Sequence, residues 1–509
     1  MNSYPWWTEE QVAFQKEVRE FVKTMIERDA VTRFTRESPE DVFAEIGKRG
    51  FLGAAIPKEY GGLGLGCTGS CILAEEFHSW SPGIGRIMVG NMNGGLRQII
   101  EHGTEEQKKR LLPEIAAGVT GAVVITETLA GTDAAGISLK AERVGDKYIL
   151  NGRKRFIVGA GVAERYFVFA RTSNDPEMIK KRKHLTAFIV RKGAPGFSVE
   201  KINDILAFEN IQNGSLDFDN VEVDIADRIG EEGEAFKIMM GGLNFERTNI
   251  AASTVGWQRL VLRNCVPYAE RRVQFGKPII DMSTNQDKIA NIVMRLNSMR
   301  NNVYIAAYRW DREEDITIDA SAIKCQGVEM ALASAEEAVQ IMGGDGVNTF
   351  YPVKNVFEVS KTEHVAGGTV EACRMTIFRS TLKTMKDDIE WVRRMIDPEY
   401  GVPVPTYKPV EDKVAPTPEN ILKVLGEDYR VNQGLHMKIE DIQWYVDGSA
   451  DEIQETVVKL VEAGDALVLK DKKTGKVKLV RASYEGINKA FPKEHYRWAP
   501  AWVTPERTF

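Results

Sequence analysis

The spacing of apolar residues divides the chain into regions of different secondary structure. From about residue 8 to 122, and again from 236 to about 385, apolar side chains recur every three or four residues, the period of a helix with one buried face. Between these regions, apolar residues gather in short strand-like runs: Val123–Ile125, Lys147–Leu150, Tyr166–Ala170 and Thr186–Val190. The pattern predicts an α+β protein with an N-terminal helical domain (1–122), a middle β domain (123–235) and a second helical domain (236–385).

One turn within the β region is indicated by its residue types. Asn151-Gly152 lies between two apolar segments, and both residues tolerate the positive φ angles of a type I′ turn. We therefore expect a β-hairpin to reverse direction at Asn151-Gly152.

Beyond residue 385 the pattern changes twice more. Five prolines within 386–417 exclude a continuous helix and predict an extended linker. Residues 418–509 then show helical segments followed by two alternating runs around a Gly-containing turn, with Ser449 placed to cap the longest helix. These segments are Pro418–Leu425, Ile439–Val446, Ser449–Ala463, Asp465–Lys470 and Lys476–Arg481. Their order is that of a winged-helix-like domain.

Charge and hydropathy restrict the kinds of partner. The net charge of −6 at pH 7 argues against a polyanion ligand, because neutralising phosphates requires a concentrated basic surface. No apolar run approaches the roughly 18–20 residues that cross a bilayer, and Met1–Trp7 lacks the charged-then-apolar pattern of a signal peptide. We expect a soluble, cytoplasmic protein with no membrane span and no nucleic acid partner.

Cysteines and histidines give no sign of a metal site. The five cysteines are scattered, and the close pair Cys67 and Cys71 has no second Cys or His pair to complete a zinc site. The six histidines contain no HExxH arrangement. We expect reduced, structural cysteines and no bound metal.

Several motifs occur together in the order of one known family. They are Gly50–Gly53, Ile56–Gly62, Gly103–Pro113, Thr126-Glu127, Asn244–Arg247, Arg271–Pro278 and Gly343–Gly346. Through them residues 5–384, about three quarters of the chain, resemble the acyl-CoA dehydrogenase flavoproteins. The resemblance implies that family's fold, with a four-helix bundle as the second helical domain. It also implies FAD-dependent oxidation of an acyl-CoA to an enoyl-CoA by a homotetramer that passes electrons to an electron-transferring flavoprotein.

The resemblance also indicates the catalytic base. Much of the family carries a glutamate in a late Tyr-Glu-Gly-Thr motif, but the matching stretch here is Val365–Thr369, with Gly367 at the position of the base. Isovaleryl-type and long-chain-type members place the base on the earlier helix, where this chain has Glu246. We therefore expect Glu246 to remove the α proton while hydride passes from the β carbon to flavin N5. Judged from the residues alone, Glu246 could instead pair with Arg247 or stabilise a helix start.

Further positions match the family's substrate and cofactor contacts. Arg247 and the backbone N–H of Gly367 match the substrate site, where Gly367 would hold the thioester oxygen together with the flavin ribityl hydroxyl. The implied FAD contacts within a subunit are Ile125, Thr126, Thr132, Phe156 and Val158, with Thr369 and Glu371 closing over the cofactor. Contacts to a neighbouring subunit's FAD would come from Arg272, Phe275, Gln340, Gly343 and Gly344. Judged from the residues alone, Arg272 could be one more exposed arginine, and Gly343-Gly344 could be a plain helix C-cap.

Val158 departs from the family pattern. The family normally has a threonine here whose hydroxyl bonds flavin N5, and valine cannot make that hydrogen bond. Either the backbone N–H suffices, or the flavin's potential and its reaction with oxygen change. A change in reactivity with oxygen leaves a flavin oxidase or hydroxylase open.

The sequence also leaves two more functions open. The same site run in reverse would reduce an enoyl-CoA. The second alternative function is that of a non-dehydrogenase flavoprotein whose tail binds DNA or a protein partner. It is left open because one stress-response branch of the family binds nucleic acid. However, residues 418–509 contain 14 Lys/Arg against 15 Asp/Glu, and the helix in the recognition position begins with the acidic stretch Ser449–Glu455. A protein partner is therefore the expected ligand of the tail.

Overall fold

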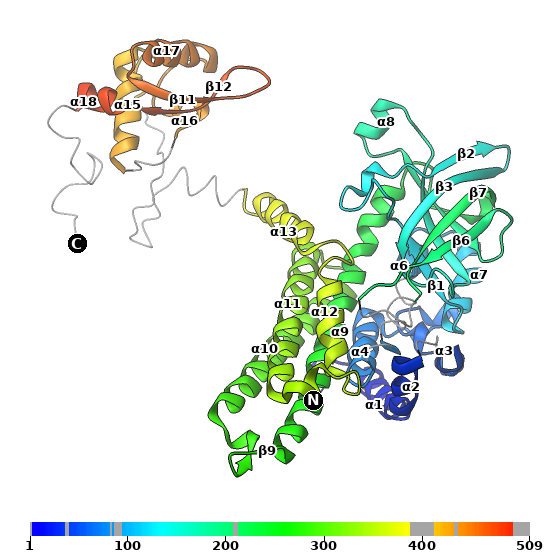
Figure 1. The fold of residues 1–509 in the computed structure, drawn as a ribbon. Helices are drawn as coiled ribbons and strands as arrows, with labels where there is room; N and C mark the ends of the chain where they lie inside the picture. Colours follow the sequence, from blue (N-terminus) through cyan, green and yellow to red (C-terminus); the bar gives the residue numbers. More distant parts are fainter. Residues whose placement is uncertain are drawn as a thin grey trace. The chain divides into compact units, whose positions relative to one another are not determined.

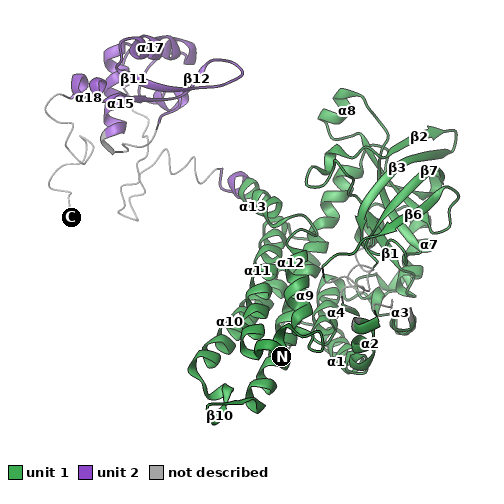
Figure 2. Cartoon of the chain, in the orientation of Figure 1, with its two compact units in different colours: residues 1–380 green, residues 381–509 purple. Residues whose placement is uncertain are grey.

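The computed structural model describes residues 3–35, 40–81, 84–85, 94–206, 212–386, 412–431 and 436–491 of the chain. They divide into two compact units, Met1–Ser380 and Thr381–Phe509 (Figure 2). Each unit has its own apolar core.

The N-terminal part of the first unit is helical, as predicted. Its helices are α1 (Glu9–Lys23), α2 (Ile26–Thr35), α3 (Glu40–Lys48), α4 (Gly66–His78), α6 (Leu96–His102) and α7 (Glu105–Ala116) (Figure 1). Thr8 and Thr104 begin α1 and α7 with capping boxes, in which each threonine accepts a backbone N–H while a glutamine three residues later reaches back. α4 is buried from Cys67 to His78 and packs against the long helix of the C-terminal bundle.

The described residues of the middle part form one eight-stranded sheet, with a short helix, α8 (Pro176–Lys180), in the connection between β4 and β5. The strand order is β6-β7-β3-β2-β4-β5-β8, and β1 pairs in parallel with β4. The strands are β1 (Gly121–Val124), β2 (Lys140–Val144), β3 (Lys147–Ile157), β4 (Arg165–Arg171), β5 (Leu185–Arg191), β6 (Phe197–Ile202), β7 (Gly214–Asp224) and β8 (Arg228–Ile229). Both faces of β4 and β5 are buried, which explains their continuous apolar runs.

The hairpin predicted at Asn151-Gly152 is wrong. β3 continues through both residues, and the turn lies earlier, where Gly145 and Asp146 join β2 to β3. Gly152 has φ +136°, and the register with β7 shifts beside it, so this residue forms a bulge. The Asn151 side chain accepts a hydrogen bond from the Asn220 backbone N–H at 2.9 Å. Asn and Gly tolerate positive φ angles, and a β-bulge can use a positive φ angle without reversing the direction of the chain.

A helical bundle follows the sheet (Figure 1). It consists of α9 (Ala235–Arg271), α10 (Ser283–Asp311), α11 (Thr317–Met342), α12 (Val353–Glu363) and α13 (Val370–Thr384), and the short strands β9 (Val273–Gln274) and β10 (Lys277–Pro278) form a ribbon after α9. α9 packs against α10, α11 and α12. The predicted α+β fold class, helical domain, sheet and bundle, is confirmed.

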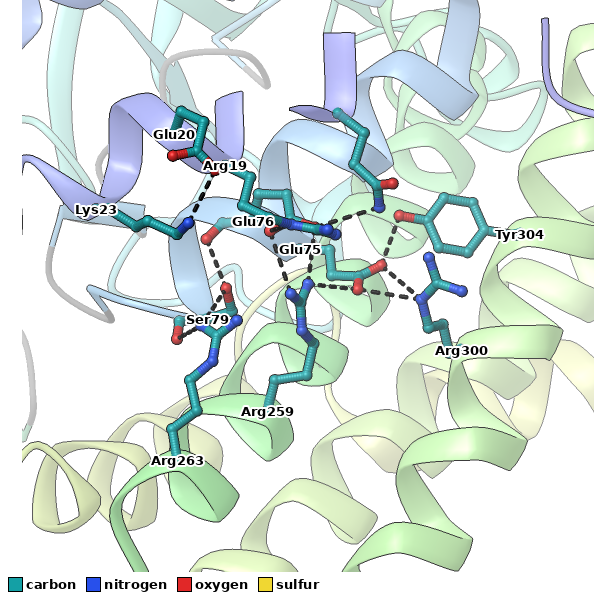
Figure 3. Close-up of polar contacts among 11 residues, drawn as sticks. Arg19, Glu20, Lys23, Glu75, Glu76, Ser79, Arg259, Arg263, Arg300 and Tyr304 are labelled. Atoms are coloured by element: carbon teal, nitrogen blue, oxygen red, sulfur yellow. Dashed lines mark hydrogen bonds and ion pairs between the residues drawn. The ribbon is translucent and has the colours of Figure 1, made fainter. Parts of the chain in front are cut away.

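A buried ion network ties the N-terminal helices to the bundle (Figure 3). Glu76 of α4 binds Arg19 at 2.7 Å and Arg259 of α9 at 2.9 Å. Its neighbour Glu75 binds Arg259 at 2.6 Å and Arg300 of α10 at 3.1 Å. Burial raises the pKa of Glu76, but the guanidinium groups of Arg19 and Arg259 outweigh burial and lower it to about 2. The network therefore fixes α9, which carries the candidate base, against α4.

The second unit has the order of elements expected for the tail. They are α15 (Pro418–Val431), α16 (Ile439–Ile442), α17 (Ala450–Glu462), β11 (Ala466–Lys470), β12 (Val477–Ala482) and α18 (Tyr484–Ala490), with β11 and β12 antiparallel. Ser449 caps α17 through its hydroxyl, as predicted. Of the predicted linker 386–417, residues 387–411 lie outside the described residues, and Val414 forms a bridge with Val446 of the tail.

Candidate active site

Glu246 and Arg247 lie on α9, within a stretch that is buried almost continuously from Phe245 to Val261. α9 begins at Ala235, so Glu246 lies well inside the helix and does not stabilise its start. Glu246 is half-buried and Arg247 is buried. A long apolar helix therefore places two adjacent charged side chains at the border of the bundle core.

The turn that carries Gly367 lies opposite Glu246. It connects α12 to α13 and bends through two left-handed glycines, Gly367 (φ +62°) and Gly368 (φ +85°). A β carbon on Gly367 would lie 3.9 Å from Oε1 of Glu246 and 2.7 Å from Cδ1 of Ile250. The turn thus approaches α9 so closely that only glycine fits without displacing Ile250.

Two cations hold consecutive carbonyls of this turn. Arg247 donates from Nε to the Gly367 carbonyl at 3.3 Å and from Nη1 to the Ser321 hydroxyl at 3.2 Å. Lys324 of α11, which is fully buried, donates from Nζ to the Gly368 carbonyl at 2.8 Å. The sequence gives no sign of this role for Lys324, because one lysine in a helical pattern does not show that its side chain points inward. The paired donors fix the orientation of the peptide groups beside Glu246.

The same cations act on a buried thiol pair behind the turn. Cys325 of α11 and Cys373 of α13 belong to one small core cluster with Ile250. The Cys325 thiol and the charges of Arg247 and Lys324 lower the pKa of Cys373 to about 6, against the opposing effect of burial. All five cysteines of the chain are free and buried.

A second group of predicted residues gathers where β1 ends beside β3. Ile125 and Thr126 follow β1, and the Arg155 backbone N–H donates to the Thr126 carbonyl at 2.9 Å. The next residue, Phe156, has a left-handed φ of +58° and is 48% exposed, with the Arg155 guanidinium 4.3 Å from its ring centroid. Val158, half-buried, packs against the bundle core. Thr132 lies exposed on the loop that leads from this group to β2.

These residues fit a flavin. An exposed aromatic side chain held on a strained backbone, beside the backbone of the loop that begins at Thr126, offers an apolar surface with polar backbone groups near it. Thr369 and Glu371 begin α13 next to Gly367, and the Thr369 hydroxyl accepts the Ala372 backbone N–H at 3.1 Å.

A third group lies at the far end of the bundle. Arg272 directly follows α9 as its C-cap, and Phe275, 94% exposed with φ +51°, lies on the turn between β9 and β10. Gln340, Gly343 and Gly344 lie at the end of α11, and Tyr268 of α9 bonds Asp345 there at 2.7 Å. At about 1.5 Å per helical residue, Arg272 lies roughly 39 Å along α9 from Glu246. The structure therefore does not bring this group to Glu246 within one chain.

The part of the chain that the structure describes offers neither a membrane span nor a metal site. None of the helices in that part is both long and apolar enough to cross a membrane. Within the same ranges, no group of three His, Cys, Asp or Glu side chains is arranged to hold a metal ion.

Comparison with known proteins gives a consistent match over the first unit. Three family models match in succession: acyl-CoA dehydrogenase N-terminal domain (8–119), middle domain (122–221) and C-terminal domain (233–382). An acyl-CoA dehydrogenase of Bacillus subtilis is 35% identical over 377 residues, which are 74% of this chain and 98% of the relative.

Further similarity comes from one more relative and one solved structure. A mitochondrial isovaleryl-CoA dehydrogenase of Oryza sativa is 32% identical over 380 residues, 74% of this chain and 91% of that protein. Butyryl-CoA dehydrogenase from Megasphaera elsdenii superposes with a TM-score of 0.71 at 31% identity, covering 75% of this chain and 100% of that structure.

Proposed function

The chain belongs to the acyl-CoA dehydrogenase family of FAD-dependent oxidoreductases, and we propose that Glu246 is the base with which it removes the α proton of an acyl-CoA. The observation that carries this proposal is the approach of the Glu246 carboxylate to Gly367. Residue 367 itself has no carboxylate, and the Glu246 carboxylate lies close to it.

The residues around Glu246 have distinct parts in the proposed reaction. The residues around Thr126 and Phe156 would hold FAD, which would supply the hydride acceptor when bound. The α proton moves to the Glu246 carboxylate, a general-base step that contributes about 10²–10⁴-fold to the rate. The N–H of Gly367 donates to the thioester oxygen, where negative charge develops. Arg247 and Lys324 hold the carbonyls of the turn and so keep that donor in place.

Assembly and electron transfer complete the proposal. We expect a cytoplasmic homotetramer, in which Arg272 and Phe275 contact FAD bound by a neighbouring copy. The roughly 39 Å along α9 between Glu246 and Arg272 supports contacts between copies over contacts within one chain. We expect the electrons to leave to an electron-transferring flavoprotein.

One titration tests substrate and base together. The purified FAD-loaded protein is mixed without oxygen with straight, branched, cyclic and aromatic acyl-CoAs, and flavin absorbance is followed in the wild type and in Glu246→Gln. Glu329→Gln is the matched control, because Glu329 is a surface carboxylate of the same bundle, paired with Arg374. Bleaching by one class of thioester, absent only in Glu246→Gln, supports the proposal. An FAD-loaded wild type that no acyl-CoA bleaches contradicts it.

A further inference from the structure

A buried ion pair lies between the segments that carry the candidate flavin contacts. Lys154 of β3 and Glu127, which follows β1, meet at 2.9 Å between Nζ and Oε1. The Lys154 side chain is completely buried and that of Glu127 almost completely. Neither residue has a part in the proposed proton transfer.

The pair is connected to the backbone on several sides. Lys154 donates from Nζ to the carbonyl of Ile125 at 2.8 Å. Glu127 accepts the Ser138 backbone N–H at 2.7 Å and hydroxyl at 2.6 Å through Oε2, and the Leu139 N–H at 2.9 Å through Oε1. The two side chains therefore join three separate segments: the end of β1, the middle of β3, and the residues just before β2.

These segments hold the predicted cofactor contacts. Ile125 and Thr126 lie next to Glu127 in the chain, and Phe156 lies two residues beyond Lys154. Between them, the Arg155 N–H bonds the Thr126 carbonyl. The loop with Thr132 leaves from Glu127 and returns at Ser138, both ends being held by the same carboxylate. Every predicted FAD contact of the β domain is thus within a few residues of this ion pair.

Stability alone does not explain a charged pair at this place. Burial of both charges carries a desolvation cost, and apolar residues of similar volume often match or exceed a buried ion pair in stability. Burial lowers the pKa of Lys154 to about 8 in spite of the attraction of Glu127. The charged pair adds geometric specificity, because its hydrogen bonds fix the positions of three backbone segments relative to one another.

We propose that the Glu127–Lys154 ion pair positions the flavin-binding segments, so that Ile125 and Thr126 are held against Phe156 in the arrangement that binds FAD. This inference rests on the proposed use of residues 125–126 and 156–158 as flavin contacts. Glu127 and Lys154 are positioning residues and do not touch the cofactor themselves.

The test separates positioning from stability. The single variants Glu127→Gln and Lys154→Met leave a buried partner unpaired, which can itself unfold the domain. The decisive variant is therefore Glu127→Gln/Lys154→Met, which removes both charges at similar size while the amide oxygen of the glutamine still accepts the hydrogen bonds from Ser138. Lys140→Met is the matched control, since Lys140 is an exposed lysine of β2 paired with Glu142. Apoprotein is titrated with FAD by flavin fluorescence, and the melting temperature of the apoprotein and the midpoint potential of bound FAD are measured.

The expected result is an apoprotein of the double variant that melts like the wild type but binds FAD at least tenfold more weakly, or binds it with a shifted potential. Unchanged affinity and potential in the double variant overturn the proposal, as does an equal loss in Lys140→Met. A double variant that does not fold also overturns it, because the pair would then be structural. These outcomes do not depend on acyl-CoA oxidation: a wild type that binds FAD but is not bleached by any acyl-CoA contradicts only the proposed reaction.

Discussion

The carboxylate of Glu246 faces Gly367: a β carbon on that glycine would lie 3.9 Å from Oε1 of Glu246. The two residues are far apart in the sequence. Glu246 belongs to the long helix α9, and Gly367 belongs to the turn before α13. A carboxylate carried by either of these two positions would therefore lie close to the other position. Arg247 joins the two positions, since it follows Glu246 in the chain and bonds the Gly367 carbonyl.

Glu246→Gln is expected to lower kcat by roughly 10²–10⁴-fold while KM for the acyl-CoA changes little, because the amide keeps the size of the side chain but cannot accept the proton. Steady-state rates with an artificial electron acceptor measure this effect. A decrease of less than tenfold would mean that another group removes the proton. Glu329→Gln should keep the wild-type rate.

Moving the carboxylate from residue 246 to residue 367 is not expected to restore activity. In Glu246→Gln/Gly367→Glu, the new side chain stands at φ +62° and its β carbon meets Ile250 Cδ1 at 2.7 Å, so strain on the order of 1–3 kcal/mol displaces the turn. Adding Ile250→Ala should remove the contact and recover part of the activity. Full activity in the variant with Ile250 intact would show that the turn is more adaptable than its packing indicates.

Glu76→Gln is expected to destabilise the protein by about 3 kcal/mol, the lower end of the cost of breaking a buried ion pair, because Arg259 loses one of its two carboxylate partners and keeps Glu75. The folded pKa of Glu76, about 2, lies below its ordinary value of 4.5. The stability that Glu76 provides is therefore fully present above pH 4.5 and is lost as the pH falls towards 2. Urea unfolding at pH 7 and pH 3.5 measures the difference between wild type and variant, which should shrink at the lower pH. Glu10→Gln, at an exposed pair with Lys58, is the control and should cost less than about 1 kcal/mol.

Lys154 gives a pH dependence of the same sign as Glu76, in a higher pH window. Its folded pKa, about 8, lies below the ordinary 10.5, so between these values the unfolded chain binds more protons than the folded one. The contribution of Lys154 to the free energy of unfolding therefore rises with pH across this window. Urea unfolding of the apoprotein at pH 7.5 and pH 10 should show wild type gaining stability relative to Lys154→Met. A constant difference between the two proteins would contradict the lowered pKa.

Two inactive variants are expected to complement each other if Arg272 acts on a neighbouring copy. Arg272→Ala should lose FAD binding and Glu246→Gln should lose proton removal. A mixed assembly then contains sites with Glu246 from one chain and Arg272 from the other. Co-expression with two affinity tags, followed by tandem purification, isolates this assembly. Activity well above that of either parent supports contacts between copies, and activity no higher than the parents places Arg272 in its own chain's site.

Much of this protein can be predicted from its sequence. The period of apolar residues identifies the helical, β and helical regions, because each element must bury one face and that requirement is local. The capping of α17 by Ser449 is local in the same way and is confirmed. The ordered motifs are enough to identify the family.

Local patterns fail where the outcome depends on packing. Asn151-Gly152 signals positive φ, but whether the chain turns or bulges there depends on β7, which pairs with β3 from far along the sequence. The inward position of Lys324 depends on the carbonyls of a turn that only the packed bundle brings to it. The joining of three segments by Glu127 and Lys154 likewise exists only in the folded sheet.

The sequence by itself determined which segments form helices and strands, which family the chain belongs to, and that Glu246 is the acidic candidate for the base. Only the tertiary structure decided that Glu246 meets Gly367, that two cations hold that turn, and that Arg272 lies at the other end of the bundle from Glu246. The physical reason is that secondary structure follows from the faces that neighbouring residues bury, whereas a site is made by side chains whose distances are set when distant elements pack together.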